Sequence, residues 1–216
     1  MKIALIGRGS SVLRSTLQLI NKHDLICIVN KLIFSGYEKY VGNKADVQFR
    51  NGNCGLYSKE EIKTLGLKKI VYTHTSNKFP SYPQYYNGIK IINPKPSIKC
   101  EINKMINGLD PSSGVCGLYY ILTNFDVKLL SIIGFDFYEL NQSPYYFKPK
   151  EADKELKHLW NNKYKNNIIN VKSGHDTDKS IELFKELVIK YNNIQFNIIT
   201  NSTKLKRIKK NNLNFL

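Results

Sequence analysis

Two serines and a glycine stand at the start of an apolar stretch in the middle of the chain. Ser112, Ser113 and Gly114 follow Pro111, and the apolar spacing of residues 115–124 predicts a helix. The first turn of a helix carries unpaired N–H groups and the positive end of the helix dipole, so these residues could bind an anion. Serine at this position is also a common N-cap without any ligand. The sequence therefore predicts either an anion site or a cap at residue 112.

A second group that could bind an anion lies near the N-terminus. Gly7, Arg8, Gly9 and Ser10 follow residues 2–6, which form a strand-like apolar run. Glycines allow a close backbone approach, Ser10 can donate to a phosphate, and the guanidinium of Arg8 can pair with it. The third glycine of the dinucleotide fingerprint is missing, so a tight turn without a ligand is an equally good interpretation.

Two further polar residues stand beside predicted elements. Asn30 ends the strand predicted at 25–29, and the carboxyl ends of parallel strands are where open α/β sheets bind ligands. His175 precedes an amphipathic helix that begins with Asp176 or Thr177 as its cap. The helix dipole disfavours the imidazolium, so a neutral His175 could act as a base. The alternative is an ordinary surface histidine.

Strand-like and helix-like segments alternate along the chain, which is typical of an α/β fold. The predicted strands are residues 2–6, 25–29, 45–49, 69–73, 89–92, 128–134 and 194–199. The predicted helices are residues 12–20, 60–65, 113–124 and 177–191. We expect a Rossmann-like, mostly parallel sheet with helices on both faces.

We expect one domain over residues 1–200, with a basic C-terminal tail at 201–216. Within the domain, residues 137–172 are polar, aromatic and basic, and we interpret them as a lid or acceptor-side segment. The tail is either a solvated end or an attachment to an anionic membrane face.

The composition limits the partners and the location. A net charge of +16 favours anionic partners, although an AT-rich genome would also supply many lysines. The four cysteines have no metal-ligand spacing, and Cys27 and Cys116 lie in apolar runs, so buried thiols are expected. The sequence shows neither a membrane-spanning run nor a signal peptide, which predicts a cytoplasmic protein.

Taken in order, these segments resemble the sialylmotifs of the sialyltransferases of glycosyltransferase family 29. The resemblance runs from Ile3 to about Leu187. The long motif is matched by residues 6–11, 23–25, 29–30, 36–38 and 41–42, the short motif by 111–114 and 134–136, motif III by 143–146, and the very short motif by His175 with the helix that follows. The tyrosine pair also resembles bacterial family-42 sialyltransferases, which share the donor class.

The resemblance implies a metal-independent, inverting enzyme with a glycosyltransferase-A variant fold. It implies CMP-sialic acid or a related CMP-ulosonic acid as donor, a glycan hydroxyl as acceptor and no cofactor. An anionic lipooligosaccharide or capsule would suit the basic surface as acceptor. The implied catalytic residues are His175 as base, with Tyr145 and Tyr146 as donors to the leaving phosphate. The implied donor-binding residues are Gly7, Arg8, Gly9, Ser10, Asn30, Ser112, Ser113, Gly114 and Asp136.

Several positions depart from the family pattern. Arg8 replaces an asparagine, Ile28 replaces an arginine, motif III lacks its histidine, and Ser180 stands where an acidic residue is expected. These departures suit a microbial or viral enzyme rather than one with animal glycan specificity. Arg8 could neutralise the phosphate in place of the missing histidine.

Three other functions compete with a transferase. A nucleotide-binding or glycan-binding protein that has lost catalysis would tolerate the altered motif positions. The charge alone would suit a nucleic-acid-binding protein, but no recognition motif accompanies it. A dinucleotide-dependent enzyme would need the glycine that is missing from the first turn.

Overall fold

The computed structural model describes residues 1–51, 55–74, 84–109, 111–137, 145–147 and 176–216. Within them the strands form an eight-stranded sheet in the order β5-β4-β3-β2-β1-β6-β7-β8, and every pairing is parallel. The strands are β1 (Lys2–Ile6), β2 (Leu25–Val29), β3 (Val47–Arg50), β4 (Lys69–Tyr72), β5 (Lys90–Ile92), β6 (Leu129–Ile133), β7 (Gln195–Ile199) and β8 (Leu213–Phe215). The predicted parallel α/β sheet is confirmed.

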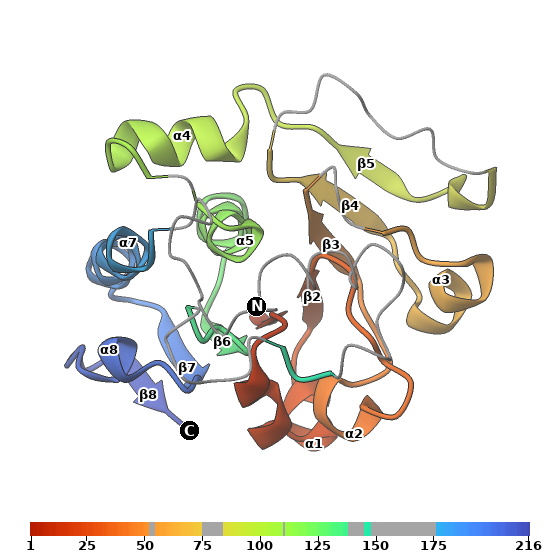
Figure 1. The fold of residues 1–216 in the computed structure, drawn as a ribbon, viewed down its shortest axis with the longest axis horizontal. Coiled ribbons are helices and arrows are strands. Elements are labelled where there is room, and N and C mark those ends of the chain that lie inside the picture. Colours follow the sequence, from red (N-terminus) through yellow and green to blue (C-terminus); the bar gives the residue numbers. More distant parts are fainter. Residues whose placement is uncertain (52–54, 75–83, 110, 138–144, 148–175) are drawn as a thin grey trace, which may run out of the picture.

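Helices cover both faces of the sheet, as Figure 1 shows. The α-helices are α1 (Leu17–Asn21), α2 (Glu38–Val41), α3 (Lys59–Leu65), α4 (Ile98–Met105), α5 (Ser113–Asn124), α7 (Thr177–Lys190) and α8 (Thr203–Lys206), and the 3-10 helices are η1 (Ser10–Arg14) and η2 (Gln84–Tyr86). One apolar core includes residues of α4, α5, α7 and α8, and the other includes residues of α1, α2 and α3.

The central strands are buried on both faces because each face packs against a helical layer. In β1, Ile3 and Leu5 belong to the core beneath α5, while Ala4 and Ile6 belong to the opposite core. This explains why the strands read as unbroken apolar runs rather than alternating ones. Cys27 and Cys116 are buried free thiols, as expected.

Two predicted elements differ from the structure. Residues 12–20, expected as one helix, form η1 and α1, because Ser15 and Thr16 are extended between them and Thr16 caps α1. The predicted basic tail at 201–216 is wrong, since α8 and β8 continue the fold and β8 pairs with β7. Leu205 is fully buried, and Arg14 Nη2 donates to the carbonyl of Leu216 at 2.7 Å.

The lid expected at 137–172 lies outside the described residues, except for residue 137 and residues 145–147. No helix in the described part of the chain is long and apolar enough to cross a membrane.

Candidate active site

The strand order reverses between β1 and β6. From β1 the chain builds the sheet toward β5 on one side, and from β6 it builds the sheet toward β8 on the other. In open parallel sheets the loops at the carboxyl ends of such strands diverge and bind ligands. The turn after β1, the turn after β6 and the loop after β2 therefore form the candidate site, together with the N-terminus of α5.

The turns after β1 and β6 pack directly against each other. The N–H of Gly7 donates to the Ile133 carbonyl at 2.7 Å, and the N–H of Gly9 donates to the Gly134 carbonyl at 2.9 Å. A Cβ on Gly7 would lie 2.6 Å from the Gly134 oxygen, and one on Gly9 would lie 2.6 Å from Asp136 Oδ2. These glycines thus permit close approach of the neighbouring turn, and their contact with a donor stays a prediction.

Asp136 supplies the anion that the Gly-Ser turn binds in this structure. Its Oδ2 accepts from the N–H of Ser11 at 2.9 Å and from the hydroxyl of Ser10 at 3.3 Å. Its Oδ1 accepts from the N–H of Asn201 at 2.8 Å, and the hydroxyl of Thr200 lies 3.4 Å away. The carboxylate therefore ties together the loops after β1, β6 and β7. Ser10 and Asp136 thus bind each other in this structure, and the donor-binding role that the sequence predicts for them stays a prediction.

Arg8 projects from the same turn toward Tyr145. The guanidinium carbon lies 4.9 Å from the centre of the Tyr145 ring, and that ring stacks on Phe147 at 5.1 Å with an interplanar angle of 5°. A cation over a stacked aromatic face is held in place without losing its charge. The structure thus brings together Arg8 and Tyr145, two residues predicted to act on the phosphate.

Tyr146 is committed to the backbone of the loop after β2. Its hydroxyl donates to the Ile33 carbonyl at 2.6 Å and accepts from the Ile33 N–H at 2.9 Å. Burial raises the pKa of Tyr146 far above its usual value. Its own N–H donates to the Arg8 carbonyl at 3.1 Å. The tyrosine pair therefore divides into one ring beneath Arg8 and one hydroxyl bound to Ile33.

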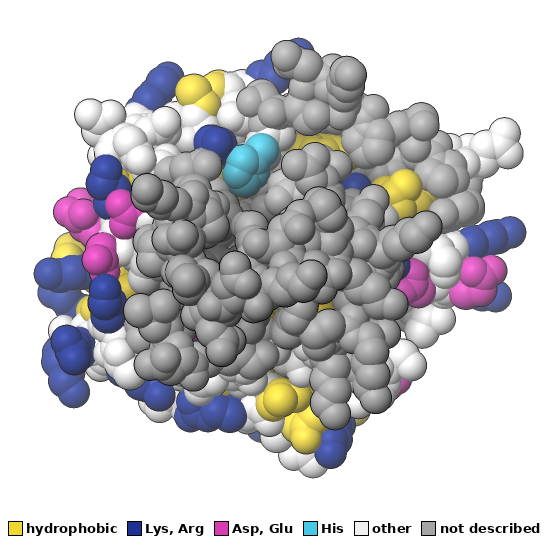
Figure 2. Space-filling model, viewed as in Figure 1, with side chains coloured by type: hydrophobic (Ala, Val, Ile, Leu, Met, Phe, Trp, Pro, Cys, Tyr) yellow, Lys and Arg dark blue, Asp and Glu magenta, His cyan; other side chains and the backbone are white. Residues whose placement is uncertain are grey.

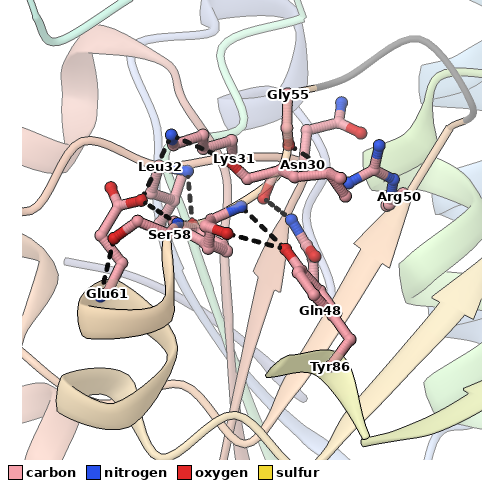
Figure 3. Close-up of polar contacts among 11 residues, drawn as sticks. Asn30, Lys31, Leu32, Gln48, Arg50, Gly55, Ser58, Glu61 and Tyr86 are labelled. Carbon is pink, nitrogen blue, oxygen red and sulfur yellow. Dashed lines mark hydrogen bonds and ion pairs between the residues drawn. The ribbon is translucent and has the colours of Figure 1, made fainter. Parts of the chain in front are cut away.

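Asn30 begins the loop after β2 in a left-handed conformation, with φ of 57°. Such a conformation is uncommon outside glycine, and asparagine tolerates it better than most residues. Gln48 Nε2 donates to its carbonyl at 2.9 Å, and the N–H of Asn51 donates to its side-chain oxygen at 3.1 Å. Figure 3 shows Asn30 beside Gln48 and Arg50, between the ends of β2 and β3.

The start of α5 shows one of the two roles that the sequence left open, the cap, and the anion site stays a prediction. The hydroxyl of Ser112 accepts from the Val115 N–H at 3.3 Å, which confirms the cap. The next two N–H groups, of Ser113 and Gly114, have no partner within the helix. A Cβ on Gly114 would lie 2.7 Å from the Phe135 ring, so this glycine lets the helix approach the turn after β6.

Two residues at neighbouring strand ends were not predicted as site residues. Asn51 follows β3 and bonds Asn30, as described above. His74 follows β4, and its Nδ1 lies 2.8 Å from the hydroxyl of Thr73, which is 3.4 Å from the hydroxyl of Ser113. The available signal was position alone, because each follows a predicted strand.

His175 lies outside the described residues. In the sequence it directly precedes Asp176, whose carboxylate caps α7 by accepting from the Lys179 N–H at 3.0 Å. The predicted helix start is therefore confirmed, and the role of His175 stays a prediction.

On the face that Figure 2 shows, the basic side chains of the described residues are not gathered at one place. Figure 2 shows Lys and Arg around the margin of one face, with Asp and Glu between them on two sides. Among the described residues no group of three His, Cys, Asp or Glu side chains could hold a metal ion.

Solved sialyltransferases share this fold. CstII from Campylobacter jejuni, in complex with the substrate analogue CMP-3FNeuAc, matches with a TM-score of 0.64 and 18% identity, over 96% of this chain and 85% of that one. The monofunctional α-2,3-sialyltransferase Cst-I from the same species matches with a TM-score of 0.59 and 16% identity, over 97% of this chain and 83% of that one. A mammalian sialyltransferase matches with a TM-score of 0.55 and 16% identity, over 90% of this chain and 68% of that one.

No protein-family model matches the chain, and no curated protein matches its sequence. The similarity of this chain to known proteins is therefore a similarity of fold.

Proposed function

We propose that the protein is an inverting glycosyltransferase that moves sialic acid or a related ulosonic acid from a CMP donor to a glycan hydroxyl. One observation carries the proposal. At the switch point of a fold shared with sialyltransferases, the turn bearing Arg8, the loop bearing Asn30 and the start of α5 lie together at the carboxyl edge of the sheet.

The donor has three features that a site must bind: a nucleoside, a phosphate leaving group and a carboxylate beside the anomeric carbon. In our proposal the loop at Asn30 holds the cytidine monophosphate. The N–H groups of Ser113 and Gly114, at the positive end of α5, hold the sugar carboxylate or the phosphate.

The reaction needs charge stabilisation on one side and a base on the other. Arg8, held over Tyr145, would neutralise the phosphate as the bond to the sugar breaks. His175 would take the proton of the acceptor hydroxyl. Attack from the side opposite the phosphate inverts the anomeric centre. Because Arg8 supplies the positive charge, we propose that no metal or other cofactor takes part.

The finer proposals concern the acceptor and the location. We propose an anionic glycan, such as a lipooligosaccharide or capsule, as acceptor, because the net charge is +16. The exposed basic side chains of α8 and the residues after it would contact the cytoplasmic face of an anionic membrane. Sedimentation with anionic and neutral vesicles tests this contact.

The experiment that tests the activity is CMP release from a panel of CMP-ulosonic acids, with a glycan acceptor present. We expect release with at least one donor, no change on adding EDTA, and loss of release in His175→Ala with CMP binding kept. Lys185→Ala, on the exposed face of α7, is the matched control. Absence of CMP binding in the wild-type protein would contradict the proposal.

One observation favours the alternative, a CMP-binding or glycan-binding protein without catalysis. The Tyr146 hydroxyl donates its single proton to the Ile33 carbonyl, so it does not donate to a leaving phosphate. Tight CMP binding without turnover of any donor would support this alternative.

A further inference from the structure

Buried tyrosine hydroxyls hold the loop after β2 in place. Tyr57 accepts from the Leu32 N–H at 2.8 Å. The hydroxyl of Tyr86 in turn binds Tyr57, accepting from its N–H at 2.9 Å and donating to its carbonyl at 3.1 Å. Figure 3 shows two of these contacts as dashed lines that meet at the Tyr86 hydroxyl. The loop that begins at Asn30 is thus fixed from the side of β3 and β5.

Tyr146 fixes the same loop from the opposite side. Its hydroxyl makes two hydrogen bonds with the backbone of Ile33. Its ring packs edge to face with the Tyr37 ring, and the two ring centres are 5.0 Å apart. Through its own N–H it is bound to the carbonyl of Arg8 at 3.1 Å. Tyr146 therefore joins the turn after β1 to the loop after β2, although 113 residues separate it from Ile33.

The contacts of its hydroxyl leave no proton for a phosphate. A tyrosine hydroxyl has one proton to donate, and here that proton goes to the Ile33 carbonyl. Moving it to a ligand would leave the part-buried Ile33 carbonyl without this partner, which costs free energy. The side chain is only 5% exposed.

We propose that Tyr146 is a positioning residue, which sets the distance between the Asn30 loop and the Arg8 turn, and that it is not a phosphate donor. This inference rests on the proposed function, because it assigns the nucleotide to the Asn30 loop and the phosphate to Arg8. We place Tyr145 beside the phosphate, because its ring lies under the Arg8 guanidinium. A change at Tyr146 should weaken donor binding, while a change at Tyr145 should slow the chemical step.

The test compares Tyr146→Phe with Tyr145→Phe and with Tyr57→Phe, which releases the loop from its other side. CMP affinity, KM for the donor and kcat are measured for each. For Tyr146→Phe we expect CMP affinity and KM to worsen about tenfold, and kcat to stay within about twofold of wild type. Tyr57→Phe should give the same pattern, because it loosens the same loop.

Tyr145→Phe should instead lower kcat about tenfold or more with CMP affinity kept. If Tyr146→Phe lowered kcat by such a factor and left CMP affinity unchanged, Tyr146 would be a phosphate donor and the inference would be overturned.

A measurement on the free protein separates this inference from the proposed function. Amide hydrogen exchange at Ile33 should be accelerated in Tyr146→Phe and unchanged in Tyr145→Phe, whether or not any donor binds. Unchanged exchange at Ile33 would overturn the positioning role. Lack of CMP binding in the wild type, with the exchange result as expected, would overturn only the proposed function.

Discussion

At the scale of single residues, several polar side chains at the carboxyl edge bind the protein itself. The Asp136 carboxylate accepts hydrogen bonds from Ser10 and Ser11 of the Gly-Ser turn, and the Tyr146 hydroxyl donates to the Ile33 carbonyl. Arg8 is the cation that we propose to face the phosphate, and this chain has it where the resembled family has an asparagine. Residue type alone could not show which polar side chains bind the protein itself and which are open to a ligand role.

Arg8→Asn tests the role of the cation. We expect affinity for CMP to fall about tenfold, because the variant removes the positive charge beside Tyr145. Titration calorimetry at two salt concentrations measures it, and the salt dependence should weaken with the affinity. Lys185→Asn makes the same change of charge on the surface of α7 and should leave affinity as it is. Unchanged affinity in Arg8→Asn would contradict the role.

His23 gives the stability a dependence on pH. Its Nδ1 donates to the Ile20 carbonyl at 3.0 Å, and its Nε2 then accepts from the Ser131 hydroxyl at 2.7 Å. Burial lowers its pKa below the usual 6.5, so the unfolded chain binds the proton first as the pH falls. The stability that the neutral His23 contributes is complete above about pH 6.5 and is lost as the pH falls below it.

The free energy of unfolding of the wild type should fall more steeply below pH 6.5 than that of His23→Gln. The difference in slope is at most about 1.4 kcal/mol per pH unit. Urea unfolding across this range measures it, and parallel curves for the two proteins would exclude His23 as the cause.

At the scale of elements, small residues set the distance between helix α5 and the sheet. A Cβ on Gly117 would lie 2.8 Å from the Phe49 ring of β3, and the equivalent contact of Gly114 is with Phe135. The helix therefore places its N-terminus against the turn after β6, where the predicted anion site lies. Gly114, which belongs to the short motif at 111–114, thus has a packing role.

Gly117→Ala tests this packing. Alanine favours a helix by about 1 kcal/mol over glycine, but overpacking of a core costs about 1–3 kcal/mol. We expect a net loss of stability in thermal unfolding. The loss should be smaller in a Phe49→Leu background, where the ring no longer meets the added methyl group. An equal effect in both backgrounds would show that the Phe49 contact is not the cause.

At the scale of the whole molecule, the C-terminal segment completes the sheet. β8 pairs with β7, the N–H of Leu216 donates to the Ile198 carbonyl at 3.0 Å, and Arg14 reaches across to Leu216 and Thr200. Removal of residues 213–216 should lower Tm by several degrees, because about 1 kcal/mol corresponds to about 2–4 °C in a domain of this size.

Lys209→Gln with Lys210→Gln is the control for that truncation, since it lowers the charge of the same exposed segment and leaves β8 intact. Differential scanning calorimetry measures both. A truncated protein with the Tm of the wild type would show that β8 does not stabilise the fold.

The sequence by itself determined the α/β class, the order of most elements and the turns beside the site. Apolar runs at Lys2–Ile6 and Leu129–Ile133, glycine turns after them and the serine cap at Ser112 are local patterns with local causes. The tertiary structure decided what the polar residues bind. Asp136 and Ser11 are 125 residues apart and Tyr146 and Ile33 are 113 apart, and such contacts follow from the packing of strands that no local spacing encodes. The same holds for β8, whose three residues form a strand only because the edge of β7 offers them a partner.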